Sequence, residues 1–231
     1  MKTPDWQWNE MQQVGTDYTD LAQVRAYDER MGAFRNVDAE NREMLSLLQL
    51  PRGAAVLEIG CGTGRFARAA AAAGLSVTAI DVSAIMLDYV RERVVAEGLP
   101  DIAMRHAGFL TMDLPAASFD AVVSGAALHH LPDAWKLVAL QNVARVLKPG
   151  GQFILRDVVF VPDEVEAPGR CFERFAACVP GMRIEAARHV AQEFSTYDWI
   201  MEGLLARAGF SIRSKDNPGE SFVIYHCISV N

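Results

Sequence analysis

The sequence predicts an α/β fold: a doubly wound, mostly parallel Rossmann-like sheet that ends in an antiparallel hairpin and follows an N-terminal helical cap. Short apolar runs that look buried on both faces alternate with helical stretches, which is typical of a parallel sheet. Two strand-like runs joined by a polar turn close the chain. A segment rich in helix formers precedes the first apolar run.

The composition describes one soluble globular domain, with or without a cap. Of 231 residues, 51% are hydrophobic, and 22 basic against 29 acidic side chains give a net charge of −7. This acidic balance, without a run of five like charges, argues against nucleic acid and anionic membranes as partners. Because a signal-like start and an apolar run of roughly 18 residues are both missing, we expect a cytoplasmic protein with reduced cysteines.

The elements follow in a regular order. Residues 21–50 are expected to form two helices with a break at 36–38. The apolar runs 55–59, 77–80, 119–124 and 153–155 are predicted strands. Between them, residues 65–73, 85–97 and 134–147 are predicted helices, which end at Gly74, at Gly98 and before Pro149. Short connections between such elements favour a parallel, doubly wound sheet.

The C-terminal part departs from this alternation. Ser195 and Asp198 resemble a capping box, and Tyr197 begins an apolar helical face that ends at Gly209. The runs 210–214 and 221–229 then predict a hairpin. Residues 161–194 carry three prolines and no clean strand pattern, so we expect a substrate-capping insertion there. The predicted organisation is a helical arm and cap at 1–44 and a ligand-binding domain at 45–231.

The sharpest local pattern is a glycine turn between a predicted strand and a helix. The spacing Gly60-x-Gly62-x-Gly64 differs from the G-x-G-x-x-G of a dinucleotide site. Glu58 at the strand tip would repel a pyrophosphate and favour a cation. Asp81 ends the next strand, where an acid that bonds a ribose diol is expected. Together, the two acids favour an adenosine with a cationic tail and no phosphate.

Five motifs in order resemble those of class I S-adenosylmethionine-dependent methyltransferases of the small-molecule type. They are VLEIGCGTG at 56–64, DVS at 81–83, SFD at 118–120, ALHHLPD at 127–133 and RVLKPGG at 145–151. The resemblance covers roughly residues 45–230. It implies a seven-stranded sheet with a terminal hairpin, S-adenosylmethionine as cofactor and S-adenosylhomocysteine as product.

The resemblance also implies roles for individual residues. Asp81 would bind the ribose, and Glu58 would hold the methionyl part. Gly108 stands where relatives commonly have an adenine-binding Asp, so either the N–H of Phe109 and packing suffice or the register differs by one or two residues. The expected cofactor residues are Tyr27, Glu58, Gly60, Cys61, Gly62, Gly64, Asp81, Val82, Met86, Gly108, Phe109, Ser124, Gly125 and Leu128.

Catalytic groups are expected beside the sulfonium. His129 or His130 would act as general base if the acceptor is a hydroxyl or a charged amine, because imidazole titrates near neutral pH. The alternative is a structural histidine that caps a helix or binds a carbonyl. Asp157 would orient such a base, or be a loop acid or a metal ligand. One candidate acid is too few for a metal cluster, so we expect no metal.

The leading hypothesis is a methyltransferase that modifies a small-molecule acceptor, at oxygen. The alternatives are a nicotinamide-dependent oxidoreductase and a non-catalytic protein that binds S-adenosylmethionine. We expect no nucleic acid or membrane partner, and a monomer or homodimer. An aromatic set in and around the non-core segments favours an enclosed, partly apolar acceptor site; its members are Trp6, Trp8, Tyr18, Phe160, Phe172, Phe175 and Tyr197.

Overall fold

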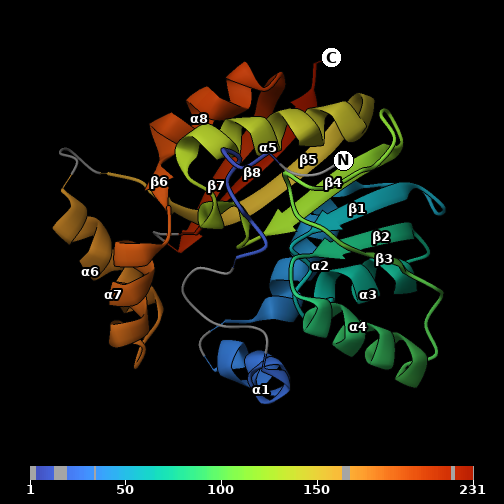
Figure 1. Ribbon diagram of the computed structural model, residues 1–231, viewed down its shortest axis with the longest axis horizontal. Coiled ribbons are helices and arrows are strands. Elements are labelled where there is room, and N and C mark those ends of the chain that lie inside the picture. The colour runs from blue at the N-terminus through green and yellow to red at the C-terminus, as the bar shows by residue number, and fades with distance from the viewer. Residues whose placement is uncertain (1–3, 13–19, 34, 163–166, 220–221, 231) are drawn as a thin grey trace.

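An open sheet forms the centre of the molecule. The structure, a computed structural model, describes residues 4–12, 20–33, 35–162, 167–219 and 222–230. Within these residues the strands lie in the order β3-β2-β1-β4-β5-β8-β7 (Figure 1). β1 to β5 pair in parallel, whereas β8 is antiparallel to both β5 and β7. The predicted fold class, including the C-terminal hairpin, is therefore confirmed.

The strands are β1 (Ala55–Ile59), β2 (Ser76–Asp81), β3 (Ala103–His106), β4 (Phe119–Gly125), β5 (Leu147–Phe160), β6 (Thr196–Tyr197), β7 (Phe210–Gly219) and β8 (Phe222–Ser229). The helices are α1 (Leu21–Gly32), α2 (Val37–Leu48), α3 (Arg65–Ala72), α4 (Ala84–Ala96), α5 (Asp133–Val146), α6 (Pro168–Cys178), α7 (Arg183–Gln192) and α8 (Asp198–Arg207), with a 3₁₀ turn η1 (Leu128–His130).

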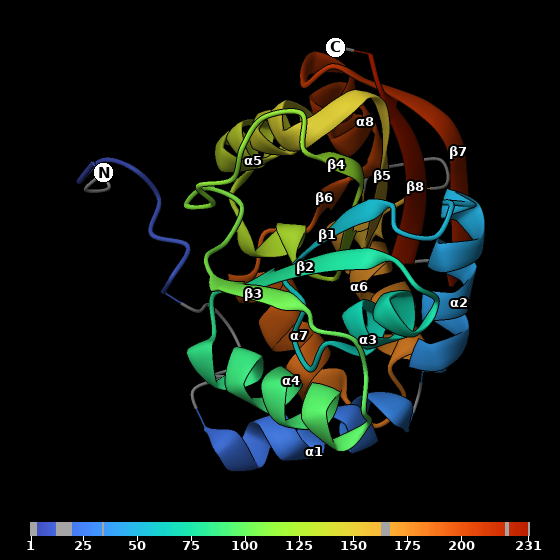
Figure 2. The same ribbon diagram turned by 90° about the vertical axis from the view of Figure 1, so that its right-hand side faces the viewer.

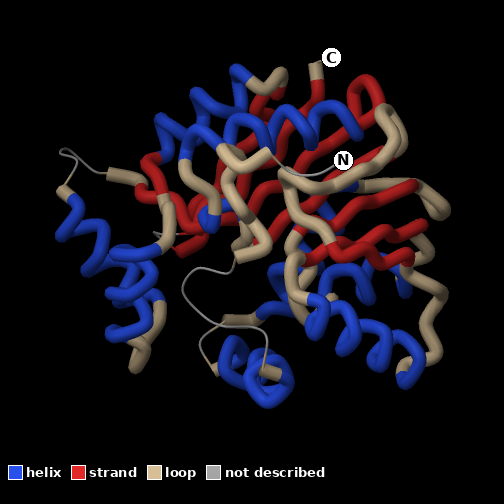
Figure 3. Tube along the Cα trace, viewed as in Figure 1, coloured by secondary structure: helices blue, strands red, loops and turns tan. Residues whose placement is uncertain are grey.

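Helices cover both faces of the sheet (Figure 3). Strand β1 shows why both faces are apolar, because successive side chains point to opposite sides. Leu57 and Ile59 belong to the core cluster with α5 and α8. Val56 belongs to the cluster with α2, α3 and α4. Burying one such side chain fully contributes about 1.5–3 kcal/mol, so both layers hold the parallel strands in place.

Helices α1, α6 and α7 lie beyond the carboxyl ends of β1 and β4 (Figure 1). The described part of the N-terminal arm passes the side of the sheet near β3, opposite to β7 (Figure 2). Trp6 of this arm stacks on Trp135 of α5 at a ring-centroid distance of 6.1 Å. The carboxyl ends of the parallel strands are therefore bordered by segments outside the sheet.

Some elements differ from the sequence prediction. Strand β5 spans Leu147–Phe160, far beyond 153–155, because the chain becomes extended directly after α5. The predicted capping box is wrong: α8 begins at Asp198 without a side-chain cap, and the Ser195 hydroxyl contacts the His189 ring instead. Tyr197 belongs to β6, which pairs with the end of β5. Residues 161–194 contain two helices, α6 and α7, and the boundary predicted at 44/45 falls inside α2.

Two further findings concern the whole described chain. In the part of the chain that the structure describes, no helix is both long enough and apolar enough to cross a membrane. Within the described residues none of the four cysteines belongs to a disulfide bond, and Cys61, Cys171 and Cys227 are buried. That the cysteines are reduced stays a prediction.

Candidate functional site

A cavity lies at the carboxyl ends of the parallel strands, next to the point where the strand order reverses. β2 and β4 flank β1 on opposite sides, which is where open α/β sheets bind ligands. Its volume is about 900 Å³, including the part that opens to solvent, which is within the range of cofactor pockets. It is lined by Glu10, Gln12, Tyr27, Ile59, Gly60, Gly62, Asp81, Val82, Met86, Ala107, Gly108, Phe109, Gly125, Ala126, Ala127, His130 and Leu131.

The structure brings most of the expected cofactor residues to this cavity. All of the expected residues are described, and those that line it are Tyr27, Gly60, Gly62, Asp81, Val82, Met86, Gly108, Phe109 and Gly125. Glu58 and Cys61 line an adjoining cavity instead. Gly64, Ser124 and Leu128 line neither of these two cavities.

The glycine turn brings bare backbone to the cavity. Gly62 has φ +51°, and a Cβ added there would meet nothing within 4 Å, so the absent side chain leaves room for a ligand. Gly60 has φ +72°, and a Cβ there would collide with Ala127 of the turn after β4. Gly64 serves packing, since its Cβ would lie 2.7 Å from the methyl groups of Val90 on α4.

Asp81 ties the end of β2 to the glycine turn. Its Oδ2 accepts a hydrogen bond from the Gly62 N–H and its Oδ1 one from the Ser83 N–H, both at 2.8 Å. Burial raises the pKa of the Asp81 carboxyl above its ordinary value, and these hydrogen bonds oppose the rise. Each carboxylate oxygen keeps further acceptor capacity, so Asp81 can accept from a diol at the cavity wall.

Glu58 lies behind the turn. Its Oε2 accepts from the Ala67 N–H of α3 at 2.9 Å, and the side chain borders the adjoining cavity of about 640 Å³. Burial, followed by the nearby charge of Asp81, raises the pKa of Glu58 well above its ordinary value. A cationic ligand group near these two acids would offset that repulsion.

The donor set fits an adenosine with a cationic tail. Val82, Met86 and Phe109 offer apolar surface for a flat ring, and Asp81 offers acceptors for a ribose. Gly62 has no side chain, so the backbone of the turn leaves open space for a ligand. Asp81 is therefore placed as the predicted ligand requires, whereas Glu58, the second predicted acid, lines only the adjoining cavity.

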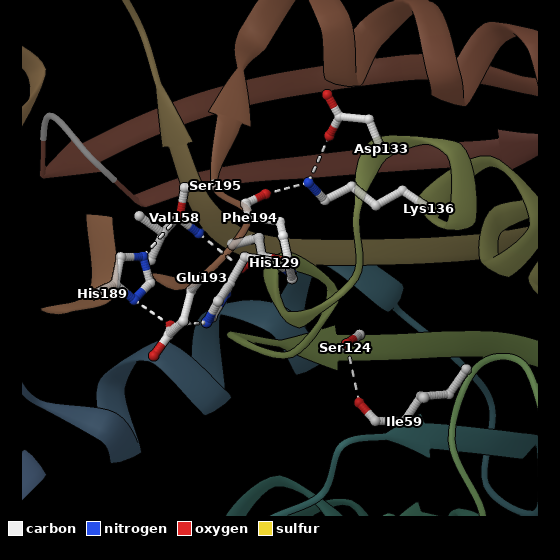
Figure 4. A network of polar contacts seen from close by, with 11 residues as sticks. Ile59, Ser124, His129, Asp133, Lys136, Val158, His189, Glu193, Phe194 and Ser195 are labelled. Carbon is white, nitrogen blue, oxygen red and sulfur yellow. Dashed lines mark hydrogen bonds and ion pairs between the residues drawn. The ribbon is translucent and has the colours of Figure 1, made fainter. Parts of the chain in front are cut away.

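Ser124 and Leu128 are part of the protein interior. The Ser124 hydroxyl donates to the Ile59 carbonyl at 2.9 Å and so links the ends of β4 and β1 (Figure 4). Leu128 is completely buried in the core cluster with α5 and α8. The structure therefore does not bring either side chain to the cavity, although both support its wall.

Tyr27 of α1 lies where the two cavities adjoin and lines both. Its neighbour Asp28 accepts a hydrogen bond from the Thr63 hydroxyl in the glycine turn at 2.7 Å. Burial raises the pKa of the Tyr27 hydroxyl, so this group is neutral. Helix α1 is thereby attached to the turn and places Tyr27 over the cavity, as the resemblance implies.

After β3, Gly108 lies at the cavity. A side chain at position 108 would collide with the carboxylate of Glu10, which comes from the N-terminal arm. Glu10 is 8% exposed and lines the same cavity. An acid therefore lies at this point of the cavity, but it comes from a different part of the chain.

His129 of η1 and Asp157 within β5 form a buried pair. Oδ1 of Asp157 contacts Nδ1 of His129, and Oδ2 accepts from the His129 N–H at 3.0 Å. On the other side, Nε2 of His129 lies 3.2 Å from Oε2 of Glu193 (Figure 4). Burial opposes a charge on His129, but the two acids outweigh it and raise the pKa of His129 to about 9. His129 is therefore an imidazolium at neutral pH, and Asp157 orients it.

Glu193 is held in place by the chain that connects α7 to α8. The Phe194 N–H donates to the His129 carbonyl at 2.8 Å, and the Phe194 carbonyl accepts from the buried Lys136 ammonium. Lys136 also donates to Asp133 at 2.7 Å (Figure 4). This connection packs the α6–α7 unit against η1 and α5.

His189 completes the polar cluster. Its Nδ1 contacts Oε2 of Glu193, and its Nε2 lies 2.7 Å from the Ser195 hydroxyl (Figure 4). His129, His189 and Glu193 each offer a ligand atom within 4.8 Å of the others, a spacing that would also suit a metal. Because one Glu193 oxygen already contacts both rings, we interpret the cluster as an ion-pair network. That the reaction needs no metal stays a prediction.

The charge on His129 predicts a pH dependence of stability. His129 has a folded pKa of about 9 and an ordinary pKa near 6.5, so its contribution is complete below about pH 6.5 and is lost as the pH rises through 9. We expect the free energy of unfolding to fall by on the order of 3 kcal/mol over this interval. Urea unfolding at pH values from 6.5 to 9.5 measures this free energy. In His129→Gln the free energy of unfolding should depend much less on pH over the interval. The same pH dependence in the variant and in the wild-type chain would contradict the prediction.

His130 has different surroundings. It lines the main cavity beside Ala127 and Leu131, and its ring centroid lies 4.4 Å from that of His129. Burial and then the charge of His129 lower the pKa of His130 to about 4. At neutral pH it is therefore a neutral imidazole that faces the cavity and can accept a proton.

The aromatic set builds the cap more than the cavity wall. Trp8 packs edge-on against Phe194 at 5.4 Å, and Phe160 packs against Tyr197 at 6.1 Å. Phe172 and Phe175 belong to a cluster under α6 and α7. Tyr18 lies outside the described residues. The aromatic side chains described here therefore attach the capping segments to the sheet.

Several site residues were not predicted from the sequence. Glu10 and Gln12 come from the arm, and Ala126 and Leu131 from the turn after β4. Ala126 adopts φ +56°, which is uncommon for a residue other than glycine. Nothing local identifies Glu10, because its partners Leu110 and Thr111 are about a hundred positions away in the chain.

Comparisons with known proteins show the family of this chain. A family model described as a methyltransferase domain matches residues 56–151. An uncharacterized methyltransferase of Geobacillus thermodenitrificans is 31% identical over 195 residues, 82% of each chain. The 27-O-demethylrifamycin SV methyltransferase of Amycolatopsis mediterranei is 36% identical over 121 residues, 52% of this chain. The match spans only 44% of that relative's length.

A solved structure has the same fold. It is a SAM-dependent methyltransferase from Aquifex aeolicus, with a TM-score of 0.65 and 19% identity, and the match covers 90% of this chain and 98% of that one. Family membership sets aside the nicotinamide-dependent oxidoreductase and the non-catalytic binding protein. The chain belongs to the class I S-adenosylmethionine-dependent methyltransferases and is an enzyme that uses S-adenosylmethionine as its cofactor.

Proposed function

We propose that this methyltransferase modifies a hydroxyl oxygen of a small-molecule acceptor and that His130 is its general base. The observation that carries the proposal is the neutral imidazole of His130 in the cavity wall. One relative is the 27-O-demethylrifamycin SV methyltransferase of Amycolatopsis mediterranei, and this name supports oxygen as the target. We expect a monomer or homodimer without a nucleic acid or membrane partner.

The cofactor would lie along the strand ends. Asp81 would accept from the ribose hydroxyls, and the backbone at Gly60 and Gly62 would border the methionyl part. Val82, Met86 and Phe109 would pack on the purine, with Tyr27 over the cofactor. When bound, S-adenosylmethionine would supply an electrophilic methyl group, which would pass from its sulfur to the acceptor oxygen and leave S-adenosylhomocysteine as the product.

The catalytic work of the protein is then alignment and removal of one proton. As the oxygen–carbon bond forms, the acceptor hydroxyl becomes a far stronger acid than an imidazolium. Even a histidine with a lowered pKa can therefore take the proton on its ring nitrogen. His129 and Asp157 do not reach the cavity lining, and we assign them a positioning role: the charged pair fixes η1 and thereby the place of His130.

The acceptor would enter from the side of His130 and Leu131, under the α6–α7 cap. Ala127 and Leu131 line the cavity beside His130. An apolar wall next to a polar base favours an acceptor with a hydrophobic body and one reactive hydroxyl.

An acceptor screen tests the proposal. The purified protein is incubated with S-adenosylmethionine labelled in its methyl group and with matched sets of phenols, aliphatic alcohols, amines and activated carbon acids, with and without a chelator. We expect labelled methyl ethers, identified by mass spectrometry, and equal rates with the chelator. Exclusive transfer to nitrogen or carbon would contradict the choice of oxygen.

A further inference from the structure

We propose that Glu10 of the N-terminal arm is the residue that selects a 6-aminopurine in this cavity, by accepting hydrogen bonds from the amino edge of the ring. The inference rests on the proposed placement of the cofactor and deepens it. It concerns a side chain that neither the glycine turn nor the strand-end motifs contain.

The carboxylate of Glu10 is held firmly by backbone and side-chain donors. Oε1 of Glu10 accepts from the Leu110 N–H at 2.8 Å, the Thr111 N–H at 2.7 Å and the Thr111 hydroxyl at 2.8 Å. The Thr111 hydroxyl in turn accepts from the Gly108 N–H at 3.0 Å. Three donors on one oxygen fix the orientation of the whole group, so the carboxylate is preorganised.

The carboxylate of Glu10 lies directly against Gly108. A side chain at position 108 would run into the Glu10 carboxylate, with Oε1 only 2.9 Å from the added Cβ. The glycine therefore provides the space that the carboxylate occupies. The arm itself is anchored by the stacking of Trp6 on Trp135 and by the contact of Trp8 with Phe194.

Glu10 lines the same cavity as Asp81 and the apolar side chains of Val82, Met86 and Phe109. A planar base between these side chains, with its ribose at Asp81, would present an edge toward Glu10. The amino group of adenine offers N–H donors there, whereas the carbonyl oxygen of hypoxanthine would face a carboxylate with like partial charge.

Binding calorimetry with two ligands tests the inference. The probes are S-adenosylhomocysteine and S-inosylhomocysteine, which carries an oxo group in place of the 6-amino group. We expect the wild-type chain to prefer the adenosyl ligand. Glu10→Ala should weaken S-adenosylhomocysteine binding about ten- to a hundredfold, the value of a hydrogen bond to a charged group. Binding of the inosyl ligand should stay unchanged or improve.

Two further variants separate recognition from arm structure. Gln7→Ala alters the arm at a side chain outside the cavity lining and should leave both affinities unchanged. In the Glu10→Ala background, Gly108→Asp places an acid on the other side of the same space and should restore the preference for the adenosyl ligand. In the wild-type background, the same substitution should weaken binding because two carboxylates would compete for one place.

Three results would overturn the inference. Glu10→Ala would weaken the binding of both ligands equally if Glu10 only holds the loop after β3. It would tighten S-adenosylhomocysteine binding if Glu10 only blocks the cavity. Failure of Gly108→Asp to restore the preference in a folded double variant would exclude recognition by an acid at this point. If the wild-type chain bound S-adenosylhomocysteine without contact to this cavity, the placement of the cofactor itself would fail.

Discussion

Replacing Asp81 by alanine is expected to weaken S-adenosylhomocysteine binding a hundredfold or more. Asp81 is nearly buried at the end of β2 and lines the cavity. Hydrogen bonds to charged groups contribute about 1.5–3 kcal/mol each, and a ribose diol would form two. The substitution also removes the acceptors for the N–H groups of Gly62 and Ser83, so the glycine turn loses its support at the same time.

A control on the same turn separates these effects. The Ser83 hydroxyl accepts from the Met86 N–H at 3.2 Å and so caps α4. Ser83→Ala therefore lowers local stability without removing an acid from the cavity, and we expect its affinity to change little. Calorimetry measures binding, and thermal unfolding checks the fold of each variant. Equal affinities of Asp81→Ala and the wild-type chain would refute the ribose assignment.

The second large effect is expected for His130→Ala. Removing a positioned general base typically lowers the turnover rate by a factor of about 10²–10⁴. Because we place the acceptor on the His130 side of the cavity, S-adenosylhomocysteine affinity should change by less than about threefold, which is within the ordinary scatter of a side chain that makes no direct hydrogen bond. Steady-state kinetics at saturating cofactor measures the rate.

Chemical rescue provides the check on this assignment. The alanine variant leaves space for a small base, so added imidazole should restore part of the rate in His130→Ala and have no effect on the wild-type chain. The wild-type rate should also be nearly constant between about pH 6 and 8, since a His130 pKa of about 4 keeps the ring neutral there. An unchanged turnover rate in His130→Ala would show that another group, or none, removes the proton.

The local part of the fold and site could be predicted from the sequence. Strand β1 and helix α5 were placed within one residue, because buried apolar runs and glycine or proline stops act over short distances. The glycine turn and Asp81 were found for the same reason: a tight turn needs its glycines in fixed order, and the acid follows at the next strand end.

Other features depend on contacts between distant segments. The sequence shows no acid at position 108, where relatives commonly have one. The acid at this point of the cavity is Glu10, which is remote in sequence and fills the space beside Gly108. Ser195 has the sequence of a cap, yet it contacts His189, since the connection from α7 to α8 is held against η1. The pKa difference between His129 and His130 depends on Glu193, which contacts the His129 ring. The position of Glu193 follows from the packing of the α6–α7 unit. Such pairings are tertiary and leave no local pattern.

The most direct test is a crystal structure of the chain with S-adenosylhomocysteine. The ribose oxygens are predicted to lie within hydrogen-bond distance of Asp81, the purine between Val82 and Phe109 with its amino group toward Glu10, and the sulfur on the His130 side of the glycine turn. A ribose remote from Asp81, or a ligand held only in the adjoining cavity beside Glu58, would contradict this account.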